Sequence, residues 1–252
     1  MRGKNLLRLL VGLAALLVRP LLIGTVLLAP VAARGEYLLI LNDDVRLETG
    51  TVAVLLAAFP DPALFAAVPS IRSPLAVCGD EGGKAGRFEG GLLEIGEVTS
   101  PRTHTSFYPV GCCYLCPRAA FLDLGGYDDA YAPFFWEDVD LGYRAWARGL
   151  RTLHLPAAAC DHEGSATLKE RRTLEERERV AFRNRVLFHL KNLRDPERRA
   201  ASLGAWAAFA LFETRPERLQ GLSEAFARDA AAPQRRGRGP SDAAILERVD
   251  AR

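Results

Sequence analysis

The sequence lacks three features that would place it in a specialised class of protein. Its net charge is only +2, from 33 basic and 31 acidic residues, so no excess of charge points to a nucleic-acid partner. Its five cysteines are an odd number and do not have the spacing of a small disulfide scaffold. We therefore expect reduced, mostly buried thiols, which are typical of a protein that lies in the cytoplasm or faces it.

The chain also lacks an uninterrupted apolar run of the roughly 18 residues that a membrane-spanning helix needs. Two shorter runs, Leu6–Val18 and Leu21–Ala33, are separated by Arg19 and Pro20. The basic residues before the first run also suit a signal peptide or a signal anchor. Residues 1–34 thus admit three interpretations: a segment inserted in or lying on a membrane, a buried helix of the soluble domain, or a cleaved signal.

What the sequence does contain is an ordinary globular composition, with 49% hydrophobic and 25% charged residues, and an alternation of strand and helix patterns. Short apolar runs predict strands at Glu36–Leu41, Leu64–Pro69, Tyr108–Cys116 and Thr152–Leu155. Helices are expected at Thr49–Phe59, Arg118–Leu124, Glu137–Arg148 and Leu168–Leu193. The glycine-rich residues 78–106 predict a loop region with at most short strands. The alternation favours an α/β layer fold with a largely parallel sheet.

The composition changes beyond Asp195, which divides the chain into three parts. After the apolar segment 1–34 and a predicted α/β domain at 35–195, Ser202–Phe212 is rich in small apolar residues. A basic stretch broken by proline and glycine, Pro233–Pro240, follows. We expect residues 196–252 to be a helical, basic C-terminal extension. Its charge would suit attraction to an anionic lipid surface, and equally a solvated end.

An acidic turn directly follows the first predicted strand and reads Asn42-Asp43-Asp44. Ligands of open α/β sheets bind at the carboxyl ends of the strands, and carboxylates there suit a hard divalent cation that holds phosphate oxygens. A plain turn is the alternative, because Asn and Asp favour turns after strands.

A second acidic cluster follows an aromatic pair, with Glu137, Asp138 and Asp140 opening a predicted helix just after Phe135 and Trp136. A helix N-terminus stabilises acids, so simple capping explains one or two of them. It explains less well an aromatic cluster that leads into paired carboxylates. Such a pair could supply the general base for an acceptor hydroxyl.

One of the four histidines, His162, lies in a polar, glycine-containing turn, where an imidazole can reach a metal or a phosphate. A surface histidine is the alternative. His154, inside a predicted strand, and His189, inside a predicted helix, are interpreted as structural.

The cysteines Cys112, Cys113 and Cys116 raise the question of zinc, with Cys160 and His162 as further ligands. Structural zinc sites usually show paired cysteines two to four residues apart in loops. Neighbouring residues of a strand point to opposite faces, so the adjacent pair cannot easily bind one ion. We therefore do not expect a zinc site made by these cysteines.

Taken together, in order and spacing, these segments resemble the family 2 glycosyltransferases with a GT-A fold, especially the bacterial rhamnosyltransferase-like branch. The resemblance rests on Gly35–Val45 (GEYLLILNDDV), the long block Val110–Gly149, the HEGSAT segment His162–Thr167 and the RNRVLFHLKN segment Arg183–Asn192. It implies a partial GT-A (Rossmann-like) fold. That fold would be a mixed, mostly parallel sheet flanked by helices, with a helical C-terminal extension.

The resemblance implies a donor side built on the acidic turn. Asp44 would hold Mn²⁺ or Mg²⁺ at the diphosphate of a nucleotide-sugar donor, and His162 would complete the metal site. Asn42 and Asp43 would contact the substrate beside them. The first position of the motif is Asn42 rather than Asp, which is common in this branch but leaves one fewer carboxylate.

The resemblance also implies an acceptor side. Glu137 and Asp138 match the family's Glu-Asp motif, with Asp138 as the base and Glu137 as an aid in positioning. Gly111 would begin the strand that lines the acceptor side, and Trp136 would lie at the sugar-binding surface. The implied reaction is an inverting displacement onto a saccharide or lipid-linked acceptor, in the cytoplasm or at the inner face of the cell membrane.

The front of the chain departs from the family pattern. Members begin with a strand that ends in a PxYN-like motif, and further strands and helices precede the metal motif. Only 35 residues precede the first strand here, and they match none of this, so we expect the N-terminal nucleotide-binding part to be lacking. Three hypotheses stay open: an active glycosyltransferase, a truncated inactive homologue, and a membrane-associated protein without enzymatic activity.

Overall fold

The computed structural model describes residues 30–164, 172–231 and 240–250 of the chain. The hypotheses on residues 1–29, on the segment after Gly164 and on the basic stretch at 232–239 concern residues outside these ranges. Among the described residues, no helix is both long enough and apolar enough to cross a membrane.

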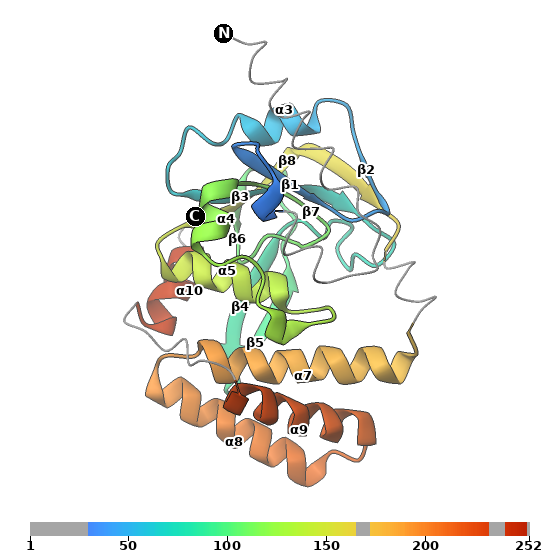
Figure 1. Ribbon diagram of the computed structural model, residues 1–252, viewed down its shortest axis with the longest axis vertical. Helices are drawn as coiled ribbons and strands as arrows, with labels where there is room; N and C mark the ends of the chain where they lie inside the picture. Colours follow the sequence, from blue (N-terminus) through green and yellow to red (C-terminus); the bar gives the residue numbers. More distant parts are fainter. Residues whose placement is uncertain (1–29, 165–171, 232–239, 251–252) are drawn as a thin grey trace.

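The molecule is built around one mixed sheet (Figure 1). Its strands are β1 (Tyr37–Leu41), β2 (Val45–Leu47), β3 (Leu64–Arg72), β6 (His104–Ser106), β7 (Cys113–Pro117) and β8 (Arg151–His162). They lie in the order β1-β7-β3-β8-β2, and β6 also pairs with β8. The central pair β3–β8 is parallel, whereas the β1–β7, β3–β7, β2–β8 and β6–β8 pairs are antiparallel. Antiparallel pairing thus has a larger share than the sequence pattern indicated.

Helices cover both faces of this sheet. Helix α3 (Thr51–Leu56) packs Leu55 against Leu39, Leu64 and Leu115 on one face. On the other face, α4 (Arg118–Asp123) and α5 (Glu137–Ala147) contribute Phe121 and Leu141 to a second apolar cluster. Strand β3 is buried on both faces, which explains its continuous apolar run. The predicted α/β fold, with a mixed sheet flanked by helices, is confirmed.

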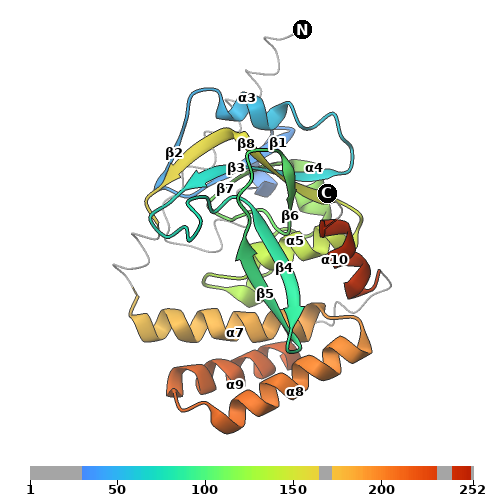
Figure 2. The same ribbon diagram turned by 180° about the vertical axis from the view of Figure 1, so that it is seen from behind.

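The glycine-rich region contains a regular hairpin that the sequence analysis did not anticipate. Strands β4 (Lys84–Glu89) and β5 (Leu92–Glu97) pair over six residues each. Gly90 and Gly91 have φ values of 57° and 85°, which a tight reversal requires and which glycine adopts without strain. The hairpin runs from the sheet toward the C-terminal helices (Figure 2). The high glycine content therefore marked the turn and the flanking loops, while the strands between them were missed.

Strand β8 is longer than predicted and carries His162 as its last residue, so this histidine lies in a strand rather than in a turn. Residues 156–159 read Pro-Ala-Ala-Ala, a weak strand-forming sequence. Pairing overrides that weakness, because β8 is held by β3 on one side and by the short strand β2 on the other. The Val45–His162 pair closes the β2–β8 ladder.

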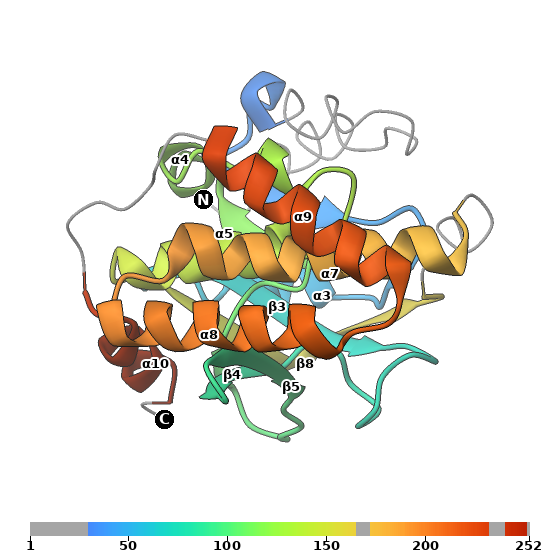
Figure 3. The ribbon, with the colours of Figure 1, turned by 90° about the horizontal axis from the view of Figure 1, so that it is seen from below.

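A layer of C-terminal helices lies beneath the sheet (Figure 3). It consists of α7 (Leu174–Asn192), α8 (Pro196–Phe212) and α9 (Pro216–Ala231). The last helix, α10 (Asp242–Asp250), packs near α5 instead. Its Asp242 accepts hydrogen bonds from the Tyr143 hydroxyl and from the backbone N–H groups of Arg194 and Asp195. The predicted helical extension is therefore folded onto the α/β domain.

Candidate active site

The acidic turn after β1 is attached to the start of β7. The Asn42 N–H donates to the Cys112 carbonyl at 2.9 Å, and the Asn42 carbonyl accepts from the Val45 N–H at 3.3 Å. Asn42 and Asp43 are exposed, whereas Asp44 is partly buried. The turn therefore presents its first two side chains to solvent and directs the third toward the protein.

Asp44 and His162 are brought together by the β2–β8 pairing. His162 Nε2 lies 3.4 Å from Asp44 Oδ1, and His162 Nδ1 lies 3.3 Å from Glu81 Oε2. The histidine is only 7% exposed, so it is not the surface residue of the alternative interpretation. The contact with Glu81, opposed by burial and supported by the charge of Asp44, raises the pKa of the imidazole above its usual value.

Glu81 is a site residue that the sequence analysis missed. Its neighbour Asp80 accepts hydrogen bonds from the N–H groups of Ile71 and Gly82, both at 2.8 Å, and lies 3.1 Å from His154 Nε2. These contacts fix the Asp-Glu-Gly-Gly turn against β3 and aim Glu81 at His162. The buried His154 acts here as the structural residue that was expected. The pair of acids Asp80 and Glu81 inside the glycine-rich stretch was the one sequence signal that could have indicated this site residue.

Asp138 is held by a backbone donor from the loop before β7. The Gly111 N–H donates to Asp138 Oδ2 at 2.9 Å, and the Val139 N–H donates to Asp138 Oδ1 at 2.8 Å. Burial raises the pKa of the Asp138 carboxyl, and these two donors partly offset the rise. Gly111 was predicted to begin the acceptor-side strand, and it lies two residues before the first residue of β7.

Glu137 lies beside Asp138, and its Oε2 is buried without a hydrogen-bond partner. Burial, and then the neighbouring charge of Asp138, raise the pKa of Glu137 to about 8. Two carboxyls with raised pKa values in one place retain a proton near neutral pH. Such a pair can keep one member neutral while the other accepts a proton.

The turn before α5 is strained and is held from α7. Phe135 and Trp136 have φ values of 71° and 72°, a conformation that costs side-chain-bearing residues about 1–3 kcal/mol each. The Asn184 side-chain amide donates to the carbonyls of Phe134 and Phe135, both at 2.8 Å, and contacts the Tyr131 carbonyl. Asn184 is fully buried, so water does not compete for these bonds. Through them, α7 fixes the backbone from which Glu137 and Asp138 project.

The Trp136 ring packs inward against helix α7. Its centroid lies 5.3 Å from that of Phe188 and 6.3 Å from that of His189. His189 Nε2 accepts the Leu93 N–H at 2.8 Å, and burial lowers the pKa of this histidine to about 4. His189 is therefore a neutral residue that joins the hairpin to α7, in keeping with its expected structural role.

The three predicted motifs converge on Gly111 and Cys112. The backbone here bonds Asn42 from the acidic turn and Asp138 from α5. Burial raises the pKa of the Cys112 thiol well above its usual range, and the nearby charges of Glu81, Asp138 and Asp44 add to that rise. Residues far apart in sequence thus form one partly buried, acidic site.

The donor atoms of this site fit a divalent cation. Asp44 offers a carboxylate oxygen, which suits Mg²⁺ or Mn²⁺, and His162 offers the Nε2 that faces it, an imidazole nitrogen of the kind that transition metals bind. His162 Nε2 is buried and makes no hydrogen bond, although it faces a carboxylate. A buried polar atom without a partner is costly in a native structure, and a bound cation would satisfy it.

Comparisons with known proteins show the fold. No protein-family model and no curated protein sequence matches the chain. A crystal structure of GalNAc-T7 with UDP, GalNAc and Mn²⁺ matches 91% of this chain at a TM-score of 0.58 and 17% identity. This chain spans 43% of that protein chain. The likeness shows that the described domain has the GT-A type of fold.

Two further solved structures are similar at lower TM-scores. The mannosyltransferase PcManGT from Pyrobaculum calidifontis, with GDP-Man and Mn²⁺, has a TM-score of 0.45 and 14% identity over 85% of this chain and 68% of that one. S. aureus TarS 1-349 has a TM-score of 0.47 and 13% identity over 90% of this chain and 61% of that one. At these scores they add nothing to the fold assignment.

Proposed function

We propose that this protein is a metal-dependent glycosyltransferase that moves a sugar from a nucleotide-sugar donor to a saccharide or lipid-linked acceptor. The observation that carries the proposal is the convergence of Asp44, His162 and Asp138 at one place in a GT-A fold. The similar GalNAc-T7 structure contains UDP, GalNAc and Mn²⁺, which supports a nucleotide-sugar donor and a divalent cation. The rhamnosyl-type branch, the acceptor class and the cytoplasmic location are proposed from the sequence alone.

On the donor side, Asp44 and His162 would hold Mn²⁺ or Mg²⁺, and Glu81 would orient the imidazole through its other nitrogen. When bound, the cation supplies Lewis-acid stabilisation of the charge that grows on the diphosphate leaving group. The exposed Asn42 and Asp43 lie on the same turn and would contact the donor from the solvent side.

On the acceptor side, Asp138 is the general base. The Gly111 N–H holds one of its oxygens, and a neutral Glu137 beside it leaves Asp138 as the ionised member of the pair. Asp138 takes the proton of the acceptor hydroxyl as the hydroxyl oxygen attacks the anomeric carbon. The bond from that carbon to the diphosphate breaks at the same time. The result is inversion at the anomeric carbon, with the proton on Asp138. Trp136 is half-buried against Phe188 and His189, and its exposed part would border the sugar-binding surface.

The test is a titration of UDP and GDP with and without Mn²⁺. We expect binding to require Mn²⁺ and to weaken at least about 10-fold in Asp44→Asn, because one charged ligand of the cation is lost. Asp161→Asn is the matched control, since Asp161 adjoins His162 on β8 but is exposed and paired with Arg72. Equal binding by wild type and Asp44→Asn, or binding by neither, would overturn the proposal in favour of an inactive homologue.

A further inference from the structure

We propose that Glu81, Cys112 and His162 form a binding site for a thiophilic divalent cation, for which Zn²⁺ is the natural probe. The site shares His162 with the proposed Mn²⁺ site. It rests on the geometry of three side chains and does not require that transfer takes place, although its inhibitory consequence rests on the proposed function.

The three residues offer one nitrogen, one sulfur and one oxygen within 4.8 Å of one another. In a tetrahedral Zn²⁺ site, two ligand atoms lie about 3.3–3.8 Å apart, since each bond is about 2.0–2.3 Å long. The His162–Glu81 pair is already at 3.3 Å. Closing the set around an ion therefore needs side-chain shifts of at most about 1–1.5 Å, which rotation of the side chains can supply.

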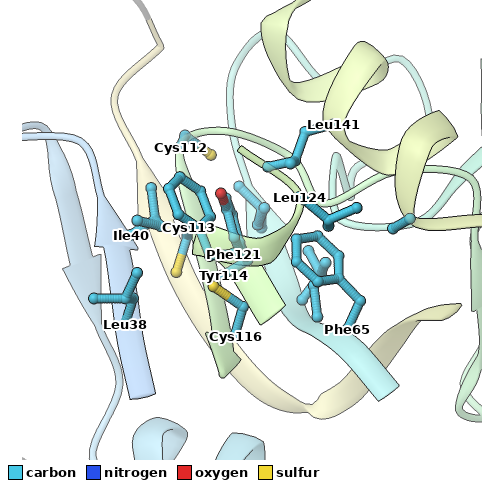
Figure 4. Packing of buried hydrophobic residues seen from close by; sticks show 14 of the residues in the cluster. Leu38, Ile40, Phe65, Cys112, Cys113, Tyr114, Cys116, Phe121, Leu124 and Leu141 are labelled. Carbon is cyan, nitrogen blue, oxygen red and sulfur yellow. The ribbon is translucent and has the colours of Figure 1, made fainter. Parts of the chain in front are cut away.

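Cys112 differs from the other buried cysteines in its place in the fold. Cys113 and Cys116 belong to β7, whereas Cys112 lies in the turn before that strand (Figure 4). It therefore does not follow the strand alternation that separates neighbouring side chains. The proposed donor set uses Cys112 alone, so the objection to two adjacent cysteines binding one ion does not apply to it.

Two further observations point to a ligand. His162 is more than nine-tenths buried, and its Nε2 has no hydrogen-bond partner. Cys112 is 5% exposed, and its sulfur lies within 4.8 Å of a nitrogen of His162 and a carboxylate oxygen of Glu81. Sulfur and imidazole ligands select Zn²⁺ over Mn²⁺ and Mg²⁺, and three protein ligands leave a fourth position for water.

This arrangement has a functional consequence. Because His162 serves both sets of ligands, a Zn²⁺ ion bound through Cys112 withdraws it from the harder cation. Zn²⁺ would then compete with Mn²⁺ and inhibit any Mn²⁺-dependent nucleotide binding.

The experiment uses the full-length, reduced protein carrying Cys78→Ser, because Cys78 is exposed and could bind soft metals by itself. Zn²⁺ and Mn²⁺ affinities are measured by calorimetry, and Co²⁺ is added as a spectroscopic probe. We expect a thiolate-to-Co²⁺ charge-transfer band in the Cys78→Ser protein. We expect its loss in Cys112→Ala, together with a fall in Zn²⁺ affinity of at least about 100-fold, the upper end of what loss of an outer-shell partner costs.

Cys116→Ala is the matched control, because it removes one sulfur from another buried cysteine of the same apolar cluster. It should keep both the band and the affinity. Absence of the band in the Cys78→Ser protein, or equal Zn²⁺ affinity in Cys112→Ala, overturns the inference. The charge-transfer band is measured in the Cys78→Ser protein with Cys112 intact, so this part of the test remains valid even if Cys112→Ala does not fold. Failure of the proposed function shows separately, as loss of the Mn²⁺-dependent UDP or GDP binding.

Discussion

Replacement of Asn184 by alanine tests whether α7 positions the catalytic pair. The substitution removes the amide that holds the carbonyls of Phe134 and Phe135. A buried carbonyl that loses its partner costs about 1–3 kcal/mol, so two of them cost about 2–6 kcal/mol if the turn stays as it is. The turn also stores about 1–3 kcal/mol at each of its two left-handed residues. Relaxing that strain offsets part of the loss, so the turn is expected to change shape rather than keep its unpaired carbonyls.

A relaxed turn moves the start of α5 and with it the Asp138 carboxylate. We expect Asn184→Ala to lower the free energy of unfolding by about 2–3 kcal/mol. A misplacement of about 1 Å at a reacting group can cost 100-fold in rate, so sugar transfer should fall by that order. Mn²⁺-dependent UDP binding should change little, because Asp44 lies in the turn between β1 and β2 and His162 ends β8, and Asn184 bonds neither of them.

Asn192 provides the control for this prediction. It lies on the same helix and is similarly buried, but its amide bonds Asp140 Oδ1 at 2.9 Å and the Tyr131 hydroxyl at 3.3 Å. Asn192→Ala should therefore destabilise the fold without moving the Phe135–Trp136 turn. Thermal unfolding and initial transfer rates are compared at a temperature where both variants are folded. Equal loss of transfer in the two variants, or wild-type transfer by Asn184→Ala, would refute the reasoning.

Two further substitutions probe the same pair of carboxyls. In Gly111→Ala the new Cβ would lie 3.3 Å from Asp138 Oδ2, so we expect a slower transfer rate with unchanged Mn²⁺-dependent UDP binding. The control is Gly96→Ala, which has open space around its Cβ and should leave both the rate and the binding unchanged. Between pH 4.5, its ordinary pKa, and about pH 8, Glu137 keeps a proton in the folded state that it loses in the unfolded state. The free energy of unfolding should therefore fall as pH rises through that window. Urea unfolding of Glu137→Gln across this range should show a flatter dependence on pH; a slope as steep as that of the wild type would contradict the assignment.

The elements with strong local signals were predicted closely. Strand β1 is an apolar run closed by an acidic turn, and α4 ends before the glycine pair Gly125-Gly126, so their predicted and observed bounds differ by one residue. The same holds for α5, whose acids open the helix and whose Gly149 follows it. In each case the signal lies within a few residues of the boundary that it marks.

The missed features depend on contacts between distant segments. The extension of β8 to His162 comes from pairing with β2, a strand of three residues that has no sequence signal of its own. Glu81 reaches the site because Asp80 is bonded to β3, and Asn184 acts on a turn about fifty residues earlier in the chain. Such roles follow from tertiary structure and cannot be obtained from local periodicity or spacing.

The pairing of Val45 with His162 also bears on how the site forms during synthesis. Asp44 is made before His162, its partner on β8, which leaves the ribosome 118 residues later (162 minus 44). At about 5–20 residues per second this interval lasts about 6–24 s. A slip of one residue in this ladder would turn the imidazole to the opposite face of the sheet. Capture of a cation by both residues therefore has to wait for the correct closure of the sheet edge, which would make metal binding a late reporter of native folding.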